Sequence, residues 1–278
     1  MMHRFIFKWL AIGLLLTSSQ CEENNLAVRK VMDIPSAAKE TSGIGIHGSL
    51  FFTHNDSGDG PFVYVLDTME KNISRKVELR GAKNVDWEDI DVEGNKLYIA
   101  DTGDNTSNRF KNTVYVVNLD SFNTAGVSLR EYDEIQFTFR NKKDKKRKVN
   151  SEAMMVVRDT IYFLSKDSKE TDVYMLPPGS DEAEKIGDVK LPFQVTAGCH
   201  MGDGTFAISG YEKLTDTYYI SDVIILTVED LPRWKGVEWN AMDLRLKAQV
   251  EGIDYDGQQL YISAEGIGIS PGRLMAIK

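Results

Sequence analysis

The stretch Asn84–Asn105, NVDWEDIDVEGNKLYIADTGDN, shows the pattern from which the fold can be predicted. Between Asp86 and Glu93, five carboxylates are interspersed with apolar residues, which is typical of a strand with one buried face. A Gly-Asn turn, a short apolar strand over residues 96–100 and the acidic loop 101–105 follow. The unit therefore consists of two antiparallel strands that end in an acidic loop.

Weaker copies of this unit recur along the whole chain. Their first strands begin near five positions that are 46, 64, 44 and 55 residues apart, namely Ser42, Glu88, Glu152, Thr196 and Glu251. Repeats of about 40–50 residues with four short strands each are typical of propeller blades. The last unit contains only three predicted strands, and a strand predicted over residues 26–34 can supply the fourth. The sequence therefore predicts an all-β fold, a five-bladed β-propeller closed by pairing the N-terminal strand with the C-terminal blade.

The residue after each of these five positions is small in four of the units. Gly43, Ala153, Ala197 and Gly252 occupy it, and Asp89 is the exception. Innermost strands crowd around the axis of a propeller, so small residues there have a steric reason.

The N-terminus has the features of an export signal. The cations Arg4 and Lys8 precede an apolar run over residues 9–16, and this run is too short to span a bilayer. Cys21 resembles the lipidated cysteine of a bacterial lipoprotein, although Gln20 departs from the usual small residue, and ordinary signal-peptide cleavage is the alternative. We expect a signal peptide over 1–20, a lipidated cysteine and tether over 21–25 and a single β-propeller domain over 26–278. This organisation predicts a protein of the bacterial cell envelope, periplasmic or on the outer-membrane surface, that contacts the membrane only through its lipid anchor.

The net charge of -9 argues against nucleic acid as a partner, because nucleic-acid binding requires a basic face. The exception is Lys142–Lys148, KKDKKRK, which we interpret either as a solvated loop or as a patch that attracts phosphate. The sequence has no motif of a serine-triad hydrolase, a P-loop protein, a dinucleotide-binding enzyme or a zinc protease. Cys199 is expected to be a small buried side chain.

Propeller topology predicts where a functional site lies. The first strand of each unit begins at one face, and the second strand returns to that face, so the residues that open the first strands converge with the loops that follow the second strands. Acidic and amide side chains dominate both groups. Among them, we expect Asn55, Asp101, Asn105, Lys166 and Tyr211 to bind a ligand, which is a small anion, a glycan or an envelope protein.

The opening residues also predict a metal site. Three carboxylates and two hydroxyl groups around one axis form an oxygen-only environment, which suits calcium. Without a cation, crowded carboxylates would repel one another and raise one another's pKa. The alternative is that each acid caps its own turn or accepts neighbouring backbone N–H groups.

The order of these motifs resembles a broad group of bacterial secreted β-propellers. The motifs are Glu40-Thr-Ser-Gly-Ile, Asp86-Trp-Glu-Asp-Ile, Ser151-Glu-Ala-Met, Val195-Thr-Ala-Gly and Val250-Glu-Gly-Ile. Their layout is also similar to that of calcium-dependent nucleotidases (apyrases), whose five-bladed propeller holds calcium in its central tunnel by one residue per blade. The resemblance implies that Ser42, Glu88, Glu152, Thr196 and Glu251 are the metal ligands. Two departures are that Thr196 stands where those enzymes have serine and that His54-Asn-Asp-Ser-Gly lacks the arginine of their Asp-Asp-Arg-Thr-Gly loop.

Two functional hypotheses follow. The first is a binding module with an axial calcium ion and an acidic rim that takes a ligand or partner protein. The second is a calcium-dependent phosphohydrolase that uses the same face, in which Asp56, Asp104 or Glu265 activates water.

Overall fold

The computed structural model describes residues 27–124, 127–141, 146–166, 170–215 and 217–278. The predicted signal peptide, Cys21 and most of its tether, and residues 142–145 of the basic run lie outside the described residues. Within the described ranges, no helix is long and apolar enough to cross a membrane.

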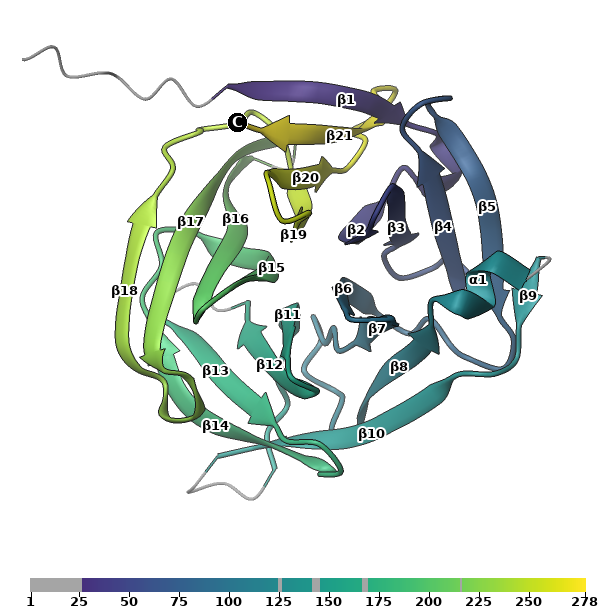
Figure 1. Cartoon of the computed structure of the whole chain (residues 1–278). Helices are drawn as coiled ribbons and strands as arrows, with labels where there is room; N and C mark the ends of the chain where they lie inside the picture. The colour runs from purple at the N-terminus through teal and green to yellow at the C-terminus, as the bar shows by residue number, and fades with distance from the viewer. Residues whose placement is uncertain (1–26, 125–126, 142–145, 167–169, 216) are drawn as a thin grey trace, which may run out of the picture.

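The chain forms a ring of short strands around a central axis (Figure 1). The strands nearest the axis are β2 (Thr41–His47), β6 (Trp87–Glu93), β11 (Ser151–Val157), β15 (Gln194–Gly202) and β19 (Val250–Tyr255). The second strands are β3 (Leu50–Asn55), β7 (Lys96–Asp101), β12 (Thr160–Ser165), β16 (Thr205–Thr215) and β20 (Leu260–Ala264). The third strands are β4 (Phe62–Asp67), β8 (Asn112–Asn118), β13 (Thr171–Leu176), β17 (Tyr218–Asp230) and β21 (Gly272–Ile277). The outer strands are β5 (Asn72–Leu79), β10 (Asp133–Arg140), β14 (Glu182–Val189), β18 (Lys235–Ala241) and β1 (Val28–Ile34).

Consecutive strands pair antiparallel from the axis outward, as in a propeller. Two outer strands, β10 and β14, also pair with each other in parallel, so the strands from β6 to β14, apart from β9, form one eight-stranded sheet. At the ends of the chain, β1 pairs antiparallel with β21, from Val28 opposite Ile277 to Ile34 opposite Gly272. The predicted pairing of the two chain ends is therefore confirmed, and the fold is all-β, as expected.

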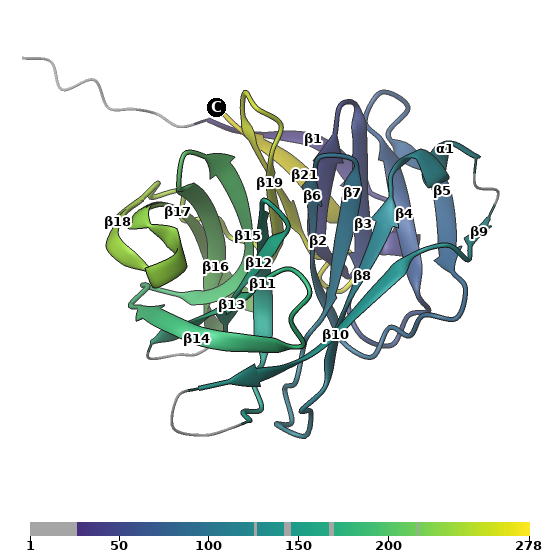
Figure 2. The ribbon, with the colours of Figure 1, turned by 60° about the horizontal axis from the view of Figure 1, so that its bottom comes forward.

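Some element boundaries differ from those expected. The β16–β17 hairpin runs from Thr205 to Asp230 and is therefore longer than the short strands that the repeat predicts, and the outer strand β18 covers residues 235–241. The long second interval of 64 residues contains the basic run and also helix α1 (Asp120–Thr124) and strand β9 (Ser128–Leu129), which pairs in parallel with β5. Two short 3₁₀ turns, η1 (Ser36–Ala38) and η2 (Leu231–Arg233), complete the elements. Figure 2 shows α1 and β9 at the periphery of the ring, next to β5. The positions of these elements depend on pairing with the edge of a neighbouring strand. The pattern of apolar residues within one segment contains no information on such pairing.

Apolar and aromatic side chains fill the space between neighbouring groups of strands. Trp87 is fully buried and lies edge-on to His54, with ring centroids 5.4 Å apart. Phe163 stacks on Phe137, with ring centroids 4.9 Å apart, and this contact joins strands of the eight-stranded sheet. Burying these side chains removes apolar surface from water and so stabilises the packing of neighbouring groups of strands.

The innermost strands approach one another very closely. A Cβ atom on Gly43, whose φ is +75°, would lie 2.6 Å from the backbone nitrogen of Ile90 on the next inner strand. A Cβ atom on Gly252 would lie 2.8 Å from the carbonyl carbon of Gly43. The steric explanation for the small residues at this position is therefore confirmed at both glycines.

Asp89, the exception among the small residues, has a different role on the axis. Its carboxylate is fully buried and accepts N–H groups from three inner strands: Ile90 at 2.9 Å, Met154 at 2.8 Å and Gly198 at 3.3 Å. The inner edge of each first strand has no strand partner, and a buried N–H group needs an acceptor. Burial raises the pKa of Asp89, while these N–H donors act in the opposite direction.

Two further carboxylates act in the same way farther along the axis. Asp91 accepts the N–H of Val156 at 2.6 Å, and Asp254 accepts the N–H of Ile46 at 2.6 Å. The three carboxylates therefore connect different inner strands by bonds from backbone to side chain.

Replacing Asp89 tests this role. Asp89→Ala leaves buried N–H groups of three inner strands without an acceptor, and each such group costs about 1–3 kcal/mol. We expect the free energy of unfolding, measured by urea denaturation, to fall by about 3 kcal/mol or more. Asp33→Ala on the exposed side of β1 is the control and should change it by less than about 0.5 kcal/mol. Equal, small effects of both substitutions would contradict the role assigned to Asp89.

Candidate functional site

The opening of each first strand lies opposite the end of the second strand, as the topology predicted. The register pairs are Ser42–His54, Trp87–Asp101, Ser151–Ser165, Val195–Gly210 and Val250–Ala264. The predicted acids therefore converge at one end of the ring. We call this end the acidic mouth and define it by Asp56, Asp86, Glu88, Glu152, Glu251, Glu265 and the cation Lys166.

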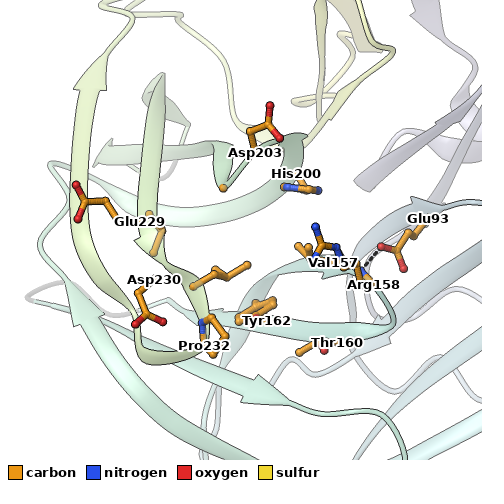
Figure 3. A pocket seen from close by; sticks show the side chains of 13 residues that line it. Glu93, Val157, Arg158, Thr160, Tyr162, His200, Asp203, Glu229, Asp230 and Pro232 are labelled. Atoms are coloured by element: carbon orange, nitrogen blue, oxygen red, sulfur yellow. Dashed lines mark hydrogen bonds between the residues drawn. The ribbon is translucent and has the colours of Figure 1, made fainter.

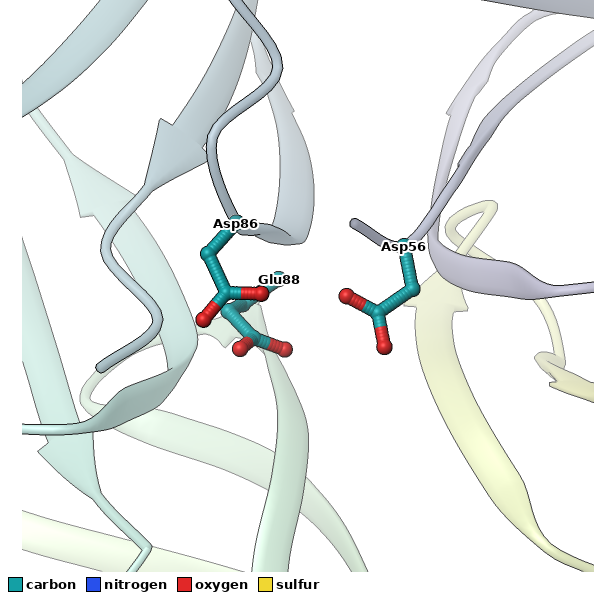
Figure 4. Close-up of side chains that lie close together, drawn as sticks. All are labelled: Asp56, Asp86 and Glu88. Carbon is teal, nitrogen blue, oxygen red and sulfur yellow. The ribbon is translucent and has the colours of Figure 1, made fainter. Parts of the chain in front are cut away.

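Three of these carboxylates form a tight cluster (Figure 4). One oxygen each of Asp56, Asp86 and Glu88 can be chosen so that all lie within 4.8 Å of one another. Glu88 belongs to β6, Asp86 directly precedes β6, and Asp56 directly follows β3. A side chain on Gly103 would overlap Glu88 Oε1 and Asp86 Oδ2, so glycine allows the loop after β7 to cover the cluster closely.

Glu88 is the most constrained member of the cluster. It is 4% exposed, and its Oε1 has no hydrogen-bond partner among the described residues. Burial raises the pKa of Glu88 well above its ordinary value, and Glu152, Asp56 and Asp86 raise it further. Burial and the charges of Asp56 and Glu152 also raise the pKa of Asp86, to about 6. A bound cation would remove this repulsion and supply the missing partner of Glu88, and oxygen-only ligands suit calcium or another hard cation.

The five residues implied by the apyrase resemblance all lie at the mouth, and four of them already have hydrogen-bond partners there. Ser42 Oγ donates to the carbonyl of Glu88 at 2.8 Å, and Thr196 Oγ1 donates to the carbonyl of Val250 at 2.7 Å. Two of the three remaining ligands also have partners. Glu152 accepts bonds from Lys166 at 3.0 Å and Asn150 at 2.8 Å, and Glu251 accepts a bond from Gln249 at 2.7 Å.

Asp86 was not among the predicted site residues. The prediction took one opening residue from each first strand. In this strand that residue was Glu88, two positions after Asp86. Its alternation with Glu88 on one strand face could have indicated it. The cluster of Asp56, Asp86 and Glu88 offers a cation a further set of oxygen ligands, which shares Glu88 with the five opening residues.

Lys166 is the only lysine or arginine in the set that defines the mouth. Its ion pair with Glu152 is largely buried, with 17% of the Lys166 side chain and 3% of the Glu152 side chain exposed. Burial lowers the pKa of Lys166, but the charges of Glu152 and Glu251 outweigh this effect and hold the pKa above its ordinary value. The ammonium group therefore stays charged and lies 5.4 Å from the centroid of the Tyr211 ring.

A cavity of about 560 Å³ opens next to Lys166, and we call it the polar pocket. Four of the predicted site residues line it, namely Asp104, Asn105, Lys166 and Tyr211. Arg147 and Lys148 from the end of the basic run also line it, although Arg147 pairs with Asp172 at 3.0 Å. The pocket therefore places amide, hydroxyl and cationic groups beside the acidic cluster.

Several predicted site residues have structural partners. Both carboxylate oxygens of Asp104 accept backbone N–H groups, from Asn108 at 2.7 Å and Arg109 at 2.9 Å. Asp101 pairs with Arg109 at 2.8 Å, and Asn55 accepts the N–H of Glu40 at 3.2 Å. These contacts hold the loops of the mouth in place.

Glu265 also belongs to the acidic mouth, and burial together with neighbouring acids perturbs its pKa. Burial, followed by the charges of Asp56 and Glu40, raises the pKa of Glu265 to about 7. A carboxyl group with such a pKa can take up and release a proton near neutral pH.

No protein-family model matches the sequence, and a comparison with curated proteins finds no match. Solved structures are similar in fold. The soluble aldose sugar dehydrogenase from Escherichia coli in its apo form has 10% identity and a TM-score of 0.54, with 91% of this chain and 99% of that chain covered. A glucose dehydrogenase has 9% identity and a TM-score of 0.53, with 91% and 99% covered.

The exo-β-1,3-galactanase from Phanerochaete chrysosporium, solved with galactose, has 12% identity and a TM-score of 0.56. The alignment covers 91% of this chain but only 64% of the galactanase chain. At such low identities the similarity concerns the fold alone, and it shows that the chain has the architecture of β-propeller proteins.

The Lys166–Glu152 pair can be tested by a double-mutant cycle. Lys166→Met removes the partner of a buried carboxylate, and breaking such a pair costs about 3–5 kcal/mol. We expect the free energy of unfolding to fall by about 3 kcal/mol, and Glu152→Gln combined with Lys166→Met should recover most of this loss. Additive effects of the two substitutions would contradict direct coupling of the two charges.

Proposed function

We propose that this protein is a five-bladed β-propeller of the bacterial cell envelope that binds a ligand or partner at its acidic mouth. The five groups of four strands, from β2–β5 to β19–β21 with β1, support five blades. The features of residues 1–25 support export and a lipid anchor at Cys21. The concentration of amide, carboxylate and lysine side chains at one face supports binding as the activity.

The mouth in this proposal contains calcium, held by Asp56, Asp86 and Glu88. The observation that carries it is the buried Oε1 of Glu88, which has no partner among the described residues and lies beside two other carboxylates. Calcium accepts carboxylate and carbonyl oxygens in flexible geometry, so backbone atoms and waters can complete its shell. The bound ion would offset the repulsion among the three acids and present a positive charge to an incoming ligand.

The ligand in this proposal is a small anion or a glycan in the polar pocket. Lys166 can bind a negative group, Tyr211 offers an aromatic face, and Asn105 can both donate and accept hydrogen bonds. Of the structures with a similar fold, two are named as sugar dehydrogenases and one contains galactose, which is consistent with a glycan. An envelope protein that offers an acidic or glycosylated segment is the corresponding partner, and nucleic acid is excluded from this proposal by the net charge of -9.

Calcium binding is tested by thermal unfolding. Adding calcium at about 100 times its Kd to chelator-treated protein should stabilise it by about 2.7 kcal/mol and raise the Tm by about 5 °C or more. Asp86→Asn and Glu88→Gln should abolish this increase, because each removes a ligand charge from the cluster. Glu40→Gln, which changes an exposed acid outside the cluster, is the control and should retain it. An unchanged Tm of the unsubstituted protein would refute the calcium site.

A calcium-dependent phosphohydrolase is the second candidate, and one observation favours it. Glu265, whose pKa is raised to about 7, can accept a proton from water near neutral pH, and Lys166 can bind a phosphate oxygen. Asp56 serves as a cation ligand in the proposed cluster, and both oxygens of Asp104 are engaged, so Glu265 is the best placed of the three predicted catalytic acids.

The second candidate is tested by phosphate release from nucleoside di- and triphosphates with and without calcium. Turnover should require calcium, and Glu265→Gln should reduce it by about 100-fold or more, because general base catalysis contributes about 10²–10⁴-fold. Calcium binding by the same variant, measured as the increase in Tm, should persist. A folded, calcium-loaded protein that releases no phosphate would leave the binding module as the function.

A further inference from the structure

The opposite end of the ring has a second cavity, of about 640 Å³, which falls within the range of small-molecule sites (Figure 3). Strands β6 and β11 begin at the acidic mouth and end here, at Glu93 and Val157. The turn between β15 and β16 and the segment from the end of β17 into η2 form its other walls. The cavity is therefore separate from the acidic mouth and from the polar pocket.

One wall of this cavity is apolar. Val157, Tyr162, Leu231 and Pro232 line it, and Val157 and Leu231 are only partly covered by the core beneath them. An apolar ligand segment that covered these side chains would gain about 25 cal/mol for each Å² removed from water.

Arg158 is the unexplained residue at the edge of the cavity. Arg158 and Asp159 form the two-residue turn between β11 and β12, and both have positive φ values, 53° and 59°. Turns of this kind favour asparagine and glycine, and a non-glycine residue there is strained. The other four turns between a first and a second strand each contain a glycine at positive φ, namely Gly48, Gly94, Gly204 and Gly257.

The contacts of Asp159 account for its position, whereas those of Arg158 do not. Asp159 bonds to Lys96 at 2.7 Å and to the Tyr98 hydroxyl at 3.1 Å. The Arg158 side chain, in contrast, makes no hydrogen bond or ion pair with the part of the chain that the structure describes, although its backbone N–H bonds to Glu93. Figure 3 shows the Arg158 side chain and His200 at the same side of the cavity.

Among the described residues, four acids line this cavity, Glu93, Asp203, Glu229 and Asp230, and two of them, Glu93 and Asp230, have partners. Glu93 accepts the backbone N–H groups of Arg158 and Asp159, the latter at 2.8 Å. Asp230 pairs with Arg233 at 2.9 Å. Figure 3 places Glu229 and Asp230 at the far side of the cavity from Arg158. The guanidinium group of Arg158 is therefore available to a ligand.

We propose that this cavity is a binding site for a small organic carboxylate with an apolar body. The carboxylate bonds to the guanidinium group of Arg158, which can donate two parallel hydrogen bonds to it. The apolar body lies on Val157, Tyr162, Leu231 and Pro232. The protein has a net charge of -9, which repels anions in general, so binding of a carboxylate requires a specific cationic group.

The test uses octanoate as the probe and isothermal titration calorimetry with the full chain. Octanoate should bind, whereas acetate, which lacks the apolar body, and octylamine, which has the opposite charge, should bind at least tenfold more weakly. Arg158→Gln should weaken octanoate binding about tenfold or more, in keeping with the loss of a charge-assisted bidentate contact. Arg245→Gln is the matched control, because Arg245 is also an exposed arginine at positive φ, 47°, and it lies outside the cavity.

A glycine variant separates ligand binding from a structural role. Arg158→Gly should abolish octanoate binding and yet raise the Tm by about 2–4 °C, since glycine adopts the positive φ without strain. A lower Tm would show that the arginine stabilises the turn and would overturn the proposal. Equal octanoate affinity of the Arg158→Gln and Arg245→Gln variants, or equal binding of octanoate and octylamine, would also overturn it.

Discussion

The structure depends on how the inner edges of its first strands satisfy their buried N–H groups. These edges face the axis, where no further strand can pair with them and the inner strands lie too close together for bulky side chains. The carboxylate of Asp89 supplies a common acceptor to β6, β11 and β15, and Asp91 and Asp254 supply further acceptors. A carboxylate can accept several N–H groups at once, which neutral side chains of similar size cannot do as well. The axis is thus held by charged side chains as well as by apolar packing.

The same strand that contributes Asp89 also contributes Glu88, and the two acids have opposite environments. Asp89 is surrounded by N–H donors, whereas Glu88 faces Asp56 and Asp86 and has an oxygen with no partner within the described part of the chain. Burial without donors raises the free energy of the charged form, so either protonation of Glu88 or a nearby cation would stabilise the acidic mouth. Lys166 provides one cation from the chain, beside Glu152 and Glu251. A metal ion in the cluster of Asp56, Asp86 and Glu88 would provide a second.

The two ends of the ring have different chemistry because different parts of the repeat reach them. Long loops after the second strands reach the mouth, and they carry aspartate, asparagine and glycine that form turns and offer oxygen ligands. Short turns between first and second strands reach the opposite end, where glycine is the usual residue. In the turn between β11 and β12, arginine stands at position 158 in place of glycine. It adds a cationic side chain to that end of the ring.

The sequence by itself determined the all-β class, the recurrence of the strand unit, the pairing of the two chain ends and the face on which the acids gather. Period-two alternation, turn residues and topology suffice for these conclusions because they depend on backbone geometry. Only the tertiary structure decided which acids share a cluster. Asp86 joined Asp56 and Glu88, while Ser42 and Thr196 bonded to neighbouring carbonyl groups and Lys166 paired with Glu152. Such choices depend on distances of a few ångströms between side chains from different strands, and a repeat pattern along one chain contains no measure of those distances.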